Sequence, residues 1–271
     1  MPNRDDELIG SVLSNAASQL RGSLGNIYSA FNRIVTREMR EGNPELDKNA
    51  ALLYQSYYRM LRLVNNLTNA AELYGQWELP MRNGDIVELC RRICREAAGL
   101  AVLQEQELVF LCEEEEHIVA MNAGGMERLL LNLLSNAMKF TGRGGRITVG
   151  LRFVEDQVEL SVSDTGCGIS QELLPTLFDR YRHVERMDPA PHGLGLGLPI
   201  CHHIAACHKG EIFAASTEGS GTSVTVLLPD EQQPTAQIHD IRFDYAGGFN
   251  HTLMELSDAL PSKAFLSRWM D

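Results

Sequence analysis

The chain has 271 residues, of which 44% are hydrophobic and 22% are charged, an ordinary composition for a globular protein with room for two modest domains. Its formal net charge of −12 argues against a protein that binds nucleic-acid phosphates or docks on an anionic membrane, and its apolar runs stay short of the roughly 20 residues that span a bilayer. The first residues do not form a signal peptide and the six cysteines are scattered, so we expect a cytoplasmic protein with no nucleic-acid and no membrane partner.

Two long amphipathic helices are predicted at the start of the chain. Apolar residues recur at helical spacing over residues 5–40, Gly42-Asn43-Pro44 breaks the pattern, and a second stripe runs at heptad spacing from Leu53 to Tyr74. Helices with so short a connection form an antiparallel hairpin, and a single hairpin leaves apolar surface open to water. The seam predicts a homodimer built as a four-helix bundle; a hairpin that packs on its own C-terminal domain is the alternative.

Helices and strands interleave in the middle of the chain. After a linker at 75–84, periodicity and turn signals predict helices at 86–97, 125–139, 173–178 and 199–208, and strands at 108–112, 118–121, 147–153, 158–164, 212–216 and 223–228. This order predicts an α+β fold, an α/β sandwich whose helices cover one face of a mostly antiparallel sheet.

The end of the chain is predicted to be an extension of that fold. A second linker is expected at 230–234, followed by a strand at 241–245 and a helix at 253–260. The elements together place the expected domain boundaries at 1–76, 77–229 and 230–271.

Three motifs in a fixed order carry the predicted chemistry, and the first lies on a helix. Asn132 and Asn136 are four residues apart, so both amides project from one helix face, and Lys139 lies one turn beyond them. A neutral asparagine oxygen suits Mg²⁺ beside a triphosphate, and a lysine suits a phosphate. Taken alone, the motif is equally consistent with a polar stripe on a surface helix.

The second motif is a carboxylate followed by two glycines. Asp164 ends an alternating strand, and a carboxylate accepts hydrogen bonds only, which matches the exocyclic amine of adenine. Gly166 and Gly168 permit a flat base to approach the backbone closely, although many turns share this pattern.

The third motif is a glycine-spaced loop that enters a helix. Gly193, Gly195 and Gly197 alternate with leucines, and the free N–H groups of the helix start favour phosphate. The spacing fits neither a Rossmann fingerprint nor a P-loop. The three arginines and two prolines of residues 180–192 predict a mobile lid over the phosphates.

The three motifs in this order resemble those of two-component sensor histidine kinases, whose ATP-binding domain is related to gyrase B and Hsp90. The similarity extends over residues 5–229 and matches the family's boxes as follows: Asn132–Lys139 the N box, Asp164–Ile169 the G1 box, Leu177–Tyr181 the F box, Gly193–Leu198 the G2 box and Glu218–Thr222 the late Gly-Thr turn. Residues 5–75 are similar to the family's dimerisation hairpin.

This resemblance implies a site for ATP and Mg²⁺. It implies that Asn136 binds the metal, that Asp164 reads adenine and that Thr222 supports the base end. The remaining residues that the boxes contribute to nucleotide binding are Asn132, Lys139, Gly166, Gly168, Tyr181, Gly193, Gly195 and Gly197.

The hairpin departs from the family at its reactive position. The resemblance puts Ser18 where the family has its phosphoacceptor histidine, Gln19 where it has an acid that acts as a base, and Ser23 where it has a proline. A serine hydroxyl must lose a proton before it attacks phosphorus, and glutamine cannot take that proton. We therefore expect no autophosphorylation by the family's route. The alternative is that Ser18 serves as a substitute acceptor.

The resemblance also bears on ATP hydrolysis. Asn132 stands where related ATPases have a water-activating glutamate, so hydrolysis is not expected.

Three functions remain open on this basis. The first is a protein that binds Mg-ATP, dimerises and regulates a two-component partner, either a response regulator or another histidine kinase. The second is an active histidine kinase that phosphorylates another acceptor or a partner protein, and the third is a non-enzymatic dimer scaffold with a vestigial ATP site. Family members often carry sensor domains and membrane spans, so the chain is expected to be a fragment or to receive its stimulus from a partner.

Overall fold

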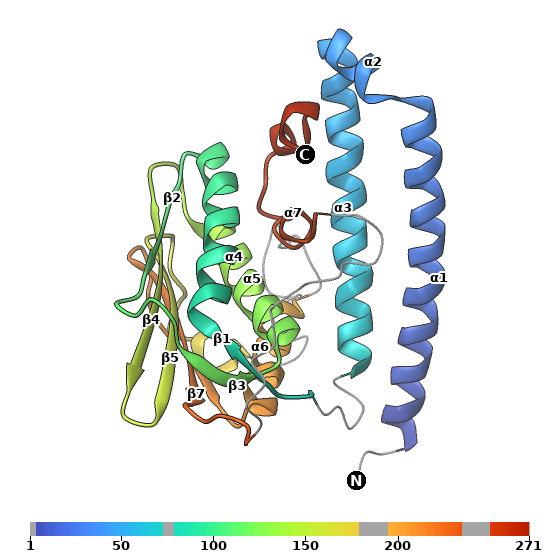
Figure 1. The fold of residues 1–271 in the computed structure, drawn as a ribbon. Helices are drawn as coiled ribbons and strands as arrows, with labels where there is room; N and C mark the ends of the chain where they lie inside the picture. Colours follow the sequence, from blue (N-terminus) through green and yellow to red (C-terminus); the bar gives the residue numbers. More distant parts are fainter. Residues whose placement is uncertain (1–3, 73–78, 179–194, 235–249, 271) are drawn as a thin grey trace. The chain divides into compact units, whose positions relative to one another are not determined.

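The computed structural model divides the chain into two compact units (Figure 1). The first unit contains residues 1–77 together with 260–271, and the second contains residues 78–259. The structure describes residues 4–72, 79–178, 195–234 and 250–270. No helix among these described residues combines the length and the apolar character that a membrane crossing requires.

The first unit is a helical hairpin. Its long helices are α1 (Arg4–Ile34) and α3 (Pro44–Glu72), which run antiparallel, with the short α2 (Arg37–Gly42) between them (Figure 1). The side chains buried along the hairpin include Ala17, Leu24, Tyr54, Tyr57, Leu61 and Val64. This pattern confirms the prediction of two amphipathic helices joined by a short connection.

The sequence predicted one helix over residues 5–40, and this prediction is wrong at Val35 and Thr36. The chain leaves the helix there, and the side chain of Thr36 accepts a hydrogen bond from the backbone N–H of Met39 at 3.4 Å, which caps α2. The β-branched run from Ile34 to Thr36 has a low helix propensity, and threonine is a favourable N-cap. The break therefore has a local cause.

The C-terminal residues complete the first unit. Two short turns, η3 (Ser262–Phe265) and η4 (Ser267–Trp269), pack on α3 and α2 respectively. The side chain of Phe265 is fully buried beside Tyr58, with 5.5 Å between the ring centroids, and Gln55 donates a hydrogen bond to the carbonyl of Leu260 at 2.7 Å.

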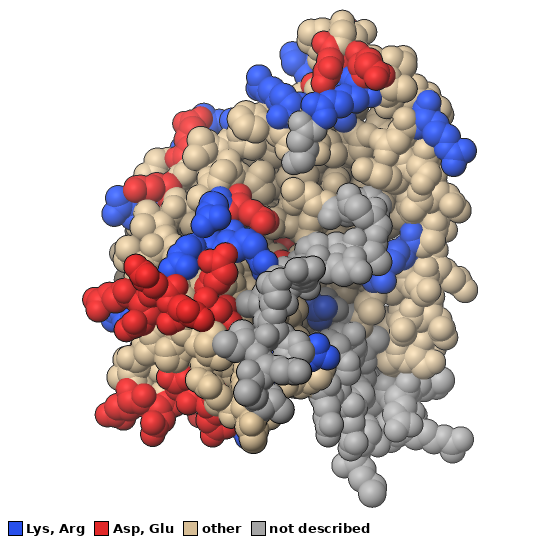
Figure 2. Space-filling view, in the orientation of Figure 1, with Lys and Arg blue, Asp and Glu red and all other residues tan. Residues whose placement is uncertain are grey.

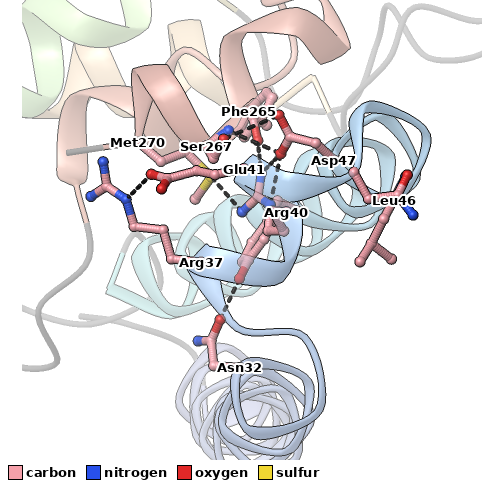
Figure 3. A network of polar contacts seen from close by, with 11 residues as sticks. Asn32, Arg37, Arg40, Glu41, Leu46, Asp47, Phe265, Ser267 and Met270 are labelled. Carbon is pink, nitrogen blue, oxygen red and sulfur yellow. Dashed lines mark hydrogen bonds and ion pairs between the residues drawn. The ribbon is translucent and has the colours of Figure 1, made fainter.

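A buried arginine fixes this C-terminal segment (Figure 3). Arg40 is only 6% exposed and donates hydrogen bonds of 2.8 Å to the carboxylate of Asp47 and to the carbonyl of Phe265. Asp47 in turn accepts bonds of 3.1 Å from both the backbone N–H and the hydroxyl of Ser267. The positive charge of Arg40 is thus paired with the carboxylate of Asp47, and both side chains make further hydrogen bonds within the unit, as a buried ion pair requires.

The second unit is built on a five-stranded sheet with the strand order β2-β4-β5-β7-β6. The strands are β2 (Glu107–Leu111), β4 (Arg146–Val154), β5 (Gln157–Asp164), β6 (Glu211–Thr217) and β7 (Gly221–Pro229). Only the β2–β4 pair is parallel; the other three pairs are antiparallel. Alternate residues of β4, β5 and β7 are buried, which places the core on one face of the sheet.

A layer of helices covers that face (Figure 1). It contains α4 (Ile86–Ala101), α5 (Ala123–Phe140) and α6 (Gly197–Cys207), and the short α7 (His251–Glu255) packs on α4 and α5. The architecture confirms the predicted α+β fold with helices on one face of a mostly antiparallel sheet.

Three predicted elements differ from the structure in this unit. The linker expected at 75–84 includes a strand, β1 (Arg82–Asp85), which pairs antiparallel with β3 (Ile118–Met121). Between residues 173 and 178 only one 3₁₀ turn forms, η2 (Leu174–Thr176), and the helix expected at 253–260 is α7, which begins earlier and ends at Glu255. The strand expected at 241–245 lies outside the described residues.

Charged side chains are distributed differently on the two units (Figure 2). On the face shown, acidic side chains gather on the sheet unit next to a smaller group of basic ones, and both kinds also occur around α2. The exposed carboxylates of the sheet unit include the run Glu113–Glu116 between β2 and β3 and the turn residues Glu155 and Asp156 between β4 and β5.

Candidate functional site

Helix α5 brings the first and third motifs together. Asn132 is 1% exposed, and Gly197, the first residue of α6, lies so close that a Cβ atom there would be 3.1 Å from the Oδ1 atom of Asn132. Asn136 and Lys139 are half-buried on the following turns of α5. The two asparagines therefore differ: Asn132 packs against the glycine loop, and Asn136 is the more accessible amide.

Asp164 lies at the end of β5, on the helix-covered face of the sheet. Its carboxylate accepts a hydrogen bond of 2.8 Å from the backbone N–H of Gly166 and another from the backbone N–H of Thr222. Burial raises the pKa of the Asp164 carboxyl above its ordinary value, although both of these hydrogen bonds act in the opposite direction. The site thus holds a half-buried carboxylate in a fixed orientation.

The glycines after Asp164 are needed by the protein's own backbone. A Cβ atom on Gly166 would be 2.5 Å from the carbonyl oxygen of Phe140 at the end of α5. A Cβ atom on Gly168, whose φ is +69°, would be 2.1 Å from the carbonyl oxygen of Thr217 on β6. These glycines therefore let the loop after β5 fit between α5 and β6, which is a different role from close contact with a base.

Three polar side chains form a row across adjacent strands at this end of the sheet. In the antiparallel register Asp164 on β5 is opposite Thr222 on β7, which is opposite Ser216 on β6. Directly opposed residues point to the same face, so the row continues the buried apolar column of Val162 and Val224. The sequence analysis selected Asp164 and Thr222 but missed Ser216, whose place in the row depends on the pairing of β6 with β7.

The start of α6 is suited to an anion. Within the described residues no side chain caps this helix, whose N-cap residue is Leu196. Gly197 and Leu198 carry N–H groups at the helix start, whereas Pro199 has none. Gly195 precedes it with a φ of +66°, a conformation that favours glycine. Two predicted site residues, Gly193 and Tyr181, lie outside the described residues, as does the arginine-rich segment 180–192.

In the hairpin, Ser18 and Gln19 lie on an uninterrupted part of α1, and both are exposed. Ser23 donates a hydrogen bond of 3.1 Å to the carbonyl of Gln19, and α1 continues through this turn. Arg21 donates bonds to Asn65 at 2.9 Å and to Thr68 at 3.3 Å, which ties this turn of α1 to α3.

The donor set near α5 is compatible with Mg²⁺. This ion takes oxygen ligands, keeps several waters and shares the phosphates of a nucleotide, so the half-buried amide oxygen of Asn136 would suit it as one ligand. Among the described residues no group of three or more His, Cys, Asp or Glu side chains is arranged to hold an ion by itself.

Comparison with known proteins agrees with this geometry. Residues 121–232 match the family described as histidine kinase-, DNA gyrase B- and HSP90-like ATPase. The sensor histidine kinase TmoS of Ectopseudomonas mendocina is 31% identical over 228 residues, which cover 83% of this chain and 23% of that protein. The histidine protein kinase DivJ of Caulobacter vibrioides is 29% identical over 222 residues, which cover 80% of this chain and 36% of that protein.

The fold is also shared with a solved structure. The crystal structure of full-length ShkA in complex with AMPPNP matches 84% of this chain and 47% of that chain, with a TM-score of 0.66 and 23% sequence identity. This chain thus spans about a quarter to a half of the length of these three proteins.

Proposed function

This chain belongs to the sensor histidine kinases through its ATPase domain, and from that premise we propose that it binds ATP with Mg²⁺, forms a homodimer and regulates a two-component partner without phosphorylating its own hairpin. One observation supports nucleotide binding more than any other. Asp164 and Thr222, paired across β5 and β7, lie in the same unit as helix α5 and the start of α6, which pack against each other. In this proposal Asp164 accepts a hydrogen bond from the adenine amine, and the N–H groups at the start of α6 hold phosphate.

We assign the metal to Asn136. Its half-buried amide would supply one oxygen ligand, and the ion would neutralise charge on the phosphates. Asn132 is buried against Gly197, which supports a packing role and leaves no carboxylate at the position of a water-activating base. ATP hydrolysis is therefore not part of the proposed function.

The hairpin lacks a suitable acceptor for the phosphoryl group. Ser18 and Gln19 are exposed on α1, and no histidine occurs before His117 in the sequence. A serine at this position needs a base to remove its proton, and Gln19 is not a base. The nucleotide would then act as a ligand that regulates the protein, and the partner would be a response regulator or a competent histidine kinase.

An unpaired apolar stripe on the hairpin supports the homodimer. Four apolar side chains of α1, spaced about a heptad apart, are between 47% and 70% exposed: Val12, Leu20, Ile27 and Ile34. Leu53 and Met60 on α3 are a further heptad pair, 39% and 44% exposed. A second hairpin would cover this stripe and complete a four-helix bundle.

All six cysteines are free and the charge is −12, which supports a reducing, cytoplasmic location.

Calorimetry tests the nucleotide site. We expect ATP to bind in the presence of Mg²⁺. We expect Asn136→Ala to lower the affinity for ATP about tenfold when Mg²⁺ is present, because one direct oxygen ligand is lost, and to leave the affinity without Mg²⁺ unchanged. The comparison is ATP with Mg²⁺ against ATP with a chelator in both proteins. No heat at millimolar ATP would favour a scaffold with a vestigial site.

Incubation with radiolabelled ATP tests the missing acceptor. We expect no label on the unmodified chain. Acid-labile label that resists base would identify phosphohistidine and an active kinase, and acid-stable label that disappears in Ser18→Ala would identify the serine as a substitute acceptor.

A further inference from the structure

Ser216, the third member of the polar row, makes three hydrogen bonds through a single hydroxyl group. Its Oγ atom lies 2.8 Å from the backbone nitrogen of Ile169, 2.8 Å from the carbonyl oxygen of Gly221 and 2.9 Å from the Oγ1 atom of Thr222. The first contact is with the loop after β5, the second is with the first residue of β7, and the third lies within the row itself. Ser216 therefore links the segments that surround Asp164.

Only one arrangement of protons satisfies all three contacts. A serine hydroxyl has one proton to donate and two lone pairs to accept with. The N–H of Ile169 can only donate, and the carbonyl of Gly221 can only accept, so the proton of Ser216 points to Gly221. The remaining lone pair must accept from Thr222, and the proton of Thr222 is therefore directed at Ser216, into the protein.

The backbone of Gly221 makes this arrangement possible. Its φ is +99°, and a Cβ atom there would be 1.9 Å from the carbonyl oxygen of Asp164, so only glycine fits. This conformation lets β7 begin directly beside the end of β5 and brings the Gly221 carbonyl to Ser216.

The consequence for a ligand is a surface that only accepts hydrogen bonds. The carboxylate of Asp164 has no proton to offer, and the hydroxyl of Thr222 presents lone pairs alone because its proton is committed to Ser216. Two acceptors side by side favour a ligand with an exocyclic amine. They disfavour a ligand with a carbonyl oxygen at the same place, because neither Asp164 nor Thr222 can donate a proton to that oxygen.

We propose that Ser216 is a positioning residue that makes the site selective for 6-aminopurine over 6-oxopurine nucleotides by fixing the direction of the Thr222 hydroxyl. The proposal rests on the proposed function, because it takes the row of Asp164, Thr222 and Ser216 as the place where the base binds. Without Ser216, Thr222 is free to rotate and to donate to a 6-oxo group, and the rejection of that group weakens.

The test compares the affinities of ATP and inosine triphosphate, which differ at position 6 of the purine, by calorimetry with Mg²⁺. We expect the unmodified protein to prefer ATP by about tenfold or more. In Ser216→Ala this preference falls to about threefold or less, because inosine triphosphate loses less affinity than ATP does. A role limited to holding the loop in place would weaken both nucleotides equally and leave the ratio unchanged.

Three further variants separate the possibilities. Ser216→Thr keeps a hydroxyl and retains the preference, and Ser223→Ala, which removes the neighbouring hydroxyl that bonds Ser163 at 2.8 Å on the other face of the sheet, also retains it. In the Thr222→Val background, adding Ser216→Ala changes the ratio no further. An unchanged ratio in Ser216→Ala, with ATP still bound by the unmodified protein, overturns this inference alone; failure of the unmodified protein to bind ATP overturns the proposed function and the inference with it.

Discussion

At the scale of single residues, Asp164 illustrates a carboxylate whose surroundings oppose its charge. Burial disfavours the ionised form, and the N–H groups of Gly166 and Thr222 compensate only in part, so the pKa stays above its ordinary value. Such a group costs free energy in the empty protein, and a ligand that offers it a donor recovers some of that cost.

Replacing this carboxylate therefore has opposite effects on binding and on stability. We expect Asp164→Asn to weaken ATP binding by about tenfold to a hundredfold, because hydrogen bonds to charged groups are worth about 1.5–3 kcal/mol. The melting temperature of the empty protein should not fall, since the variant no longer buries a charge. Calorimetry and thermal unfolding measure the two quantities, and Asp156→Asn in the exposed β4–β5 turn is the matched control. Equal ATP affinity in both variants would remove Asp164 from the site.

The raised pKa of Asp164 also predicts the pH dependence of binding. The carboxylate is the form that accepts from the amine, so ATP affinity should fall as the pH is lowered through a range that begins above the ordinary aspartate value of about 3.9. The stability of the empty fold changes in the other direction: the contribution of Asp164 is full below the pKa of the unfolded chain and is lost as the pH rises through the higher folded pKa. Calorimetry at a series of pH values measures how ATP affinity changes. In Asp164→Asn the fall in affinity that is due to protonation of Asp164 should be missing.

Residue-level reasoning from the sequence selected the side chains that carry distinctive chemistry. Many turns share the pattern of Asp164 and its glycines, so this motif was selected because it lies in series with the two others. The contact between Asn132 and Gly197 joins two segments that were chosen separately. Ser216 was missed because a serine in an alternating strand has no distinctive signal; its role follows from the register of β6 against β7.

At the scale of elements, α1 has two apolar stripes, and one hairpin buries only one of them. Ala17 and Leu24 are buried in the hairpin, whereas Leu20, Ile27 and Ile34 are exposed at intervals of seven residues. A regular heptad on an exposed face is typical of a helix that meets a further helix.

A charge in this stripe should therefore dissociate the proposed homodimer. We expect Ile27→Asp to raise the dimer dissociation constant at least tenfold, because the substitution is made twice in a symmetric interface and buries an unpaired carboxylate each time. Sedimentation equilibrium measures the change. Asn26→Asp, at an exposed neighbouring position that is not in the heptad, should leave the assembly intact. If Ile27→Asp assembles as the unmodified protein does, the seam lies elsewhere.

The buried ion pair of Arg40 and the exposed pair of Arg37 offer a second matched comparison (Figure 3). Arg40→Ala would leave Asp47 and the carbonyl of Phe265 without their cationic partner, and we expect it to destabilise the hairpin unit by about 3–5 kcal/mol. Arg37→Ala removes an exposed ion pair with Glu41 and should cost less, about 1 kcal/mol. Hydrogen exchange of residues 262–270 reports the loss; unchanged protection in Arg40→Ala would mean that other contacts hold the segment.

Elements with a strong internal period were predicted well, and elements that depend on a partner were not. Helix α5 and the β4–β5 hairpin follow from apolar spacing and from the two-residue turn at Glu155 and Asp156. Strand β1 has no apolar alternation in Arg82–Asp85, and it exists because β3 supplies its hydrogen bonds. The docking of Phe265 could not be predicted either, because it joins residues more than 200 positions apart.

At the scale of the whole molecule, the proposed function assigns a nucleotide site to the sheet unit and a helix without an acceptor to the hairpin unit. If the missing side chains are the only defect, restoring them should restore the reaction. We expect the double substitution Ser18→His with Gln19→Glu to give acid-labile, base-stable label from radiolabelled ATP, since an imidazole needs no separate base to attack phosphorus.

Two controls accompany this experiment. The unmodified chain should remain unlabelled, and adding Asp164→Asn to the double variant should reduce the label by weakening ATP binding. A double variant that binds ATP normally yet remains unlabelled would mean that more than the acceptor has been lost.

The buried Phe265 and the partners of Arg40 have a consequence for biosynthesis. A ribosome delivers α1 and α3 long before it delivers the segment that finishes their packing, because the contacts of Arg40 and Asp47 are with residues 265–270. The nascent helices therefore cannot complete their packing, and Tyr58 lacks the ring of Phe265, until residues 265–270 have been made. Translation that stops early would release a hairpin with exposed aromatic surface, a natural substrate for chaperones and proteases.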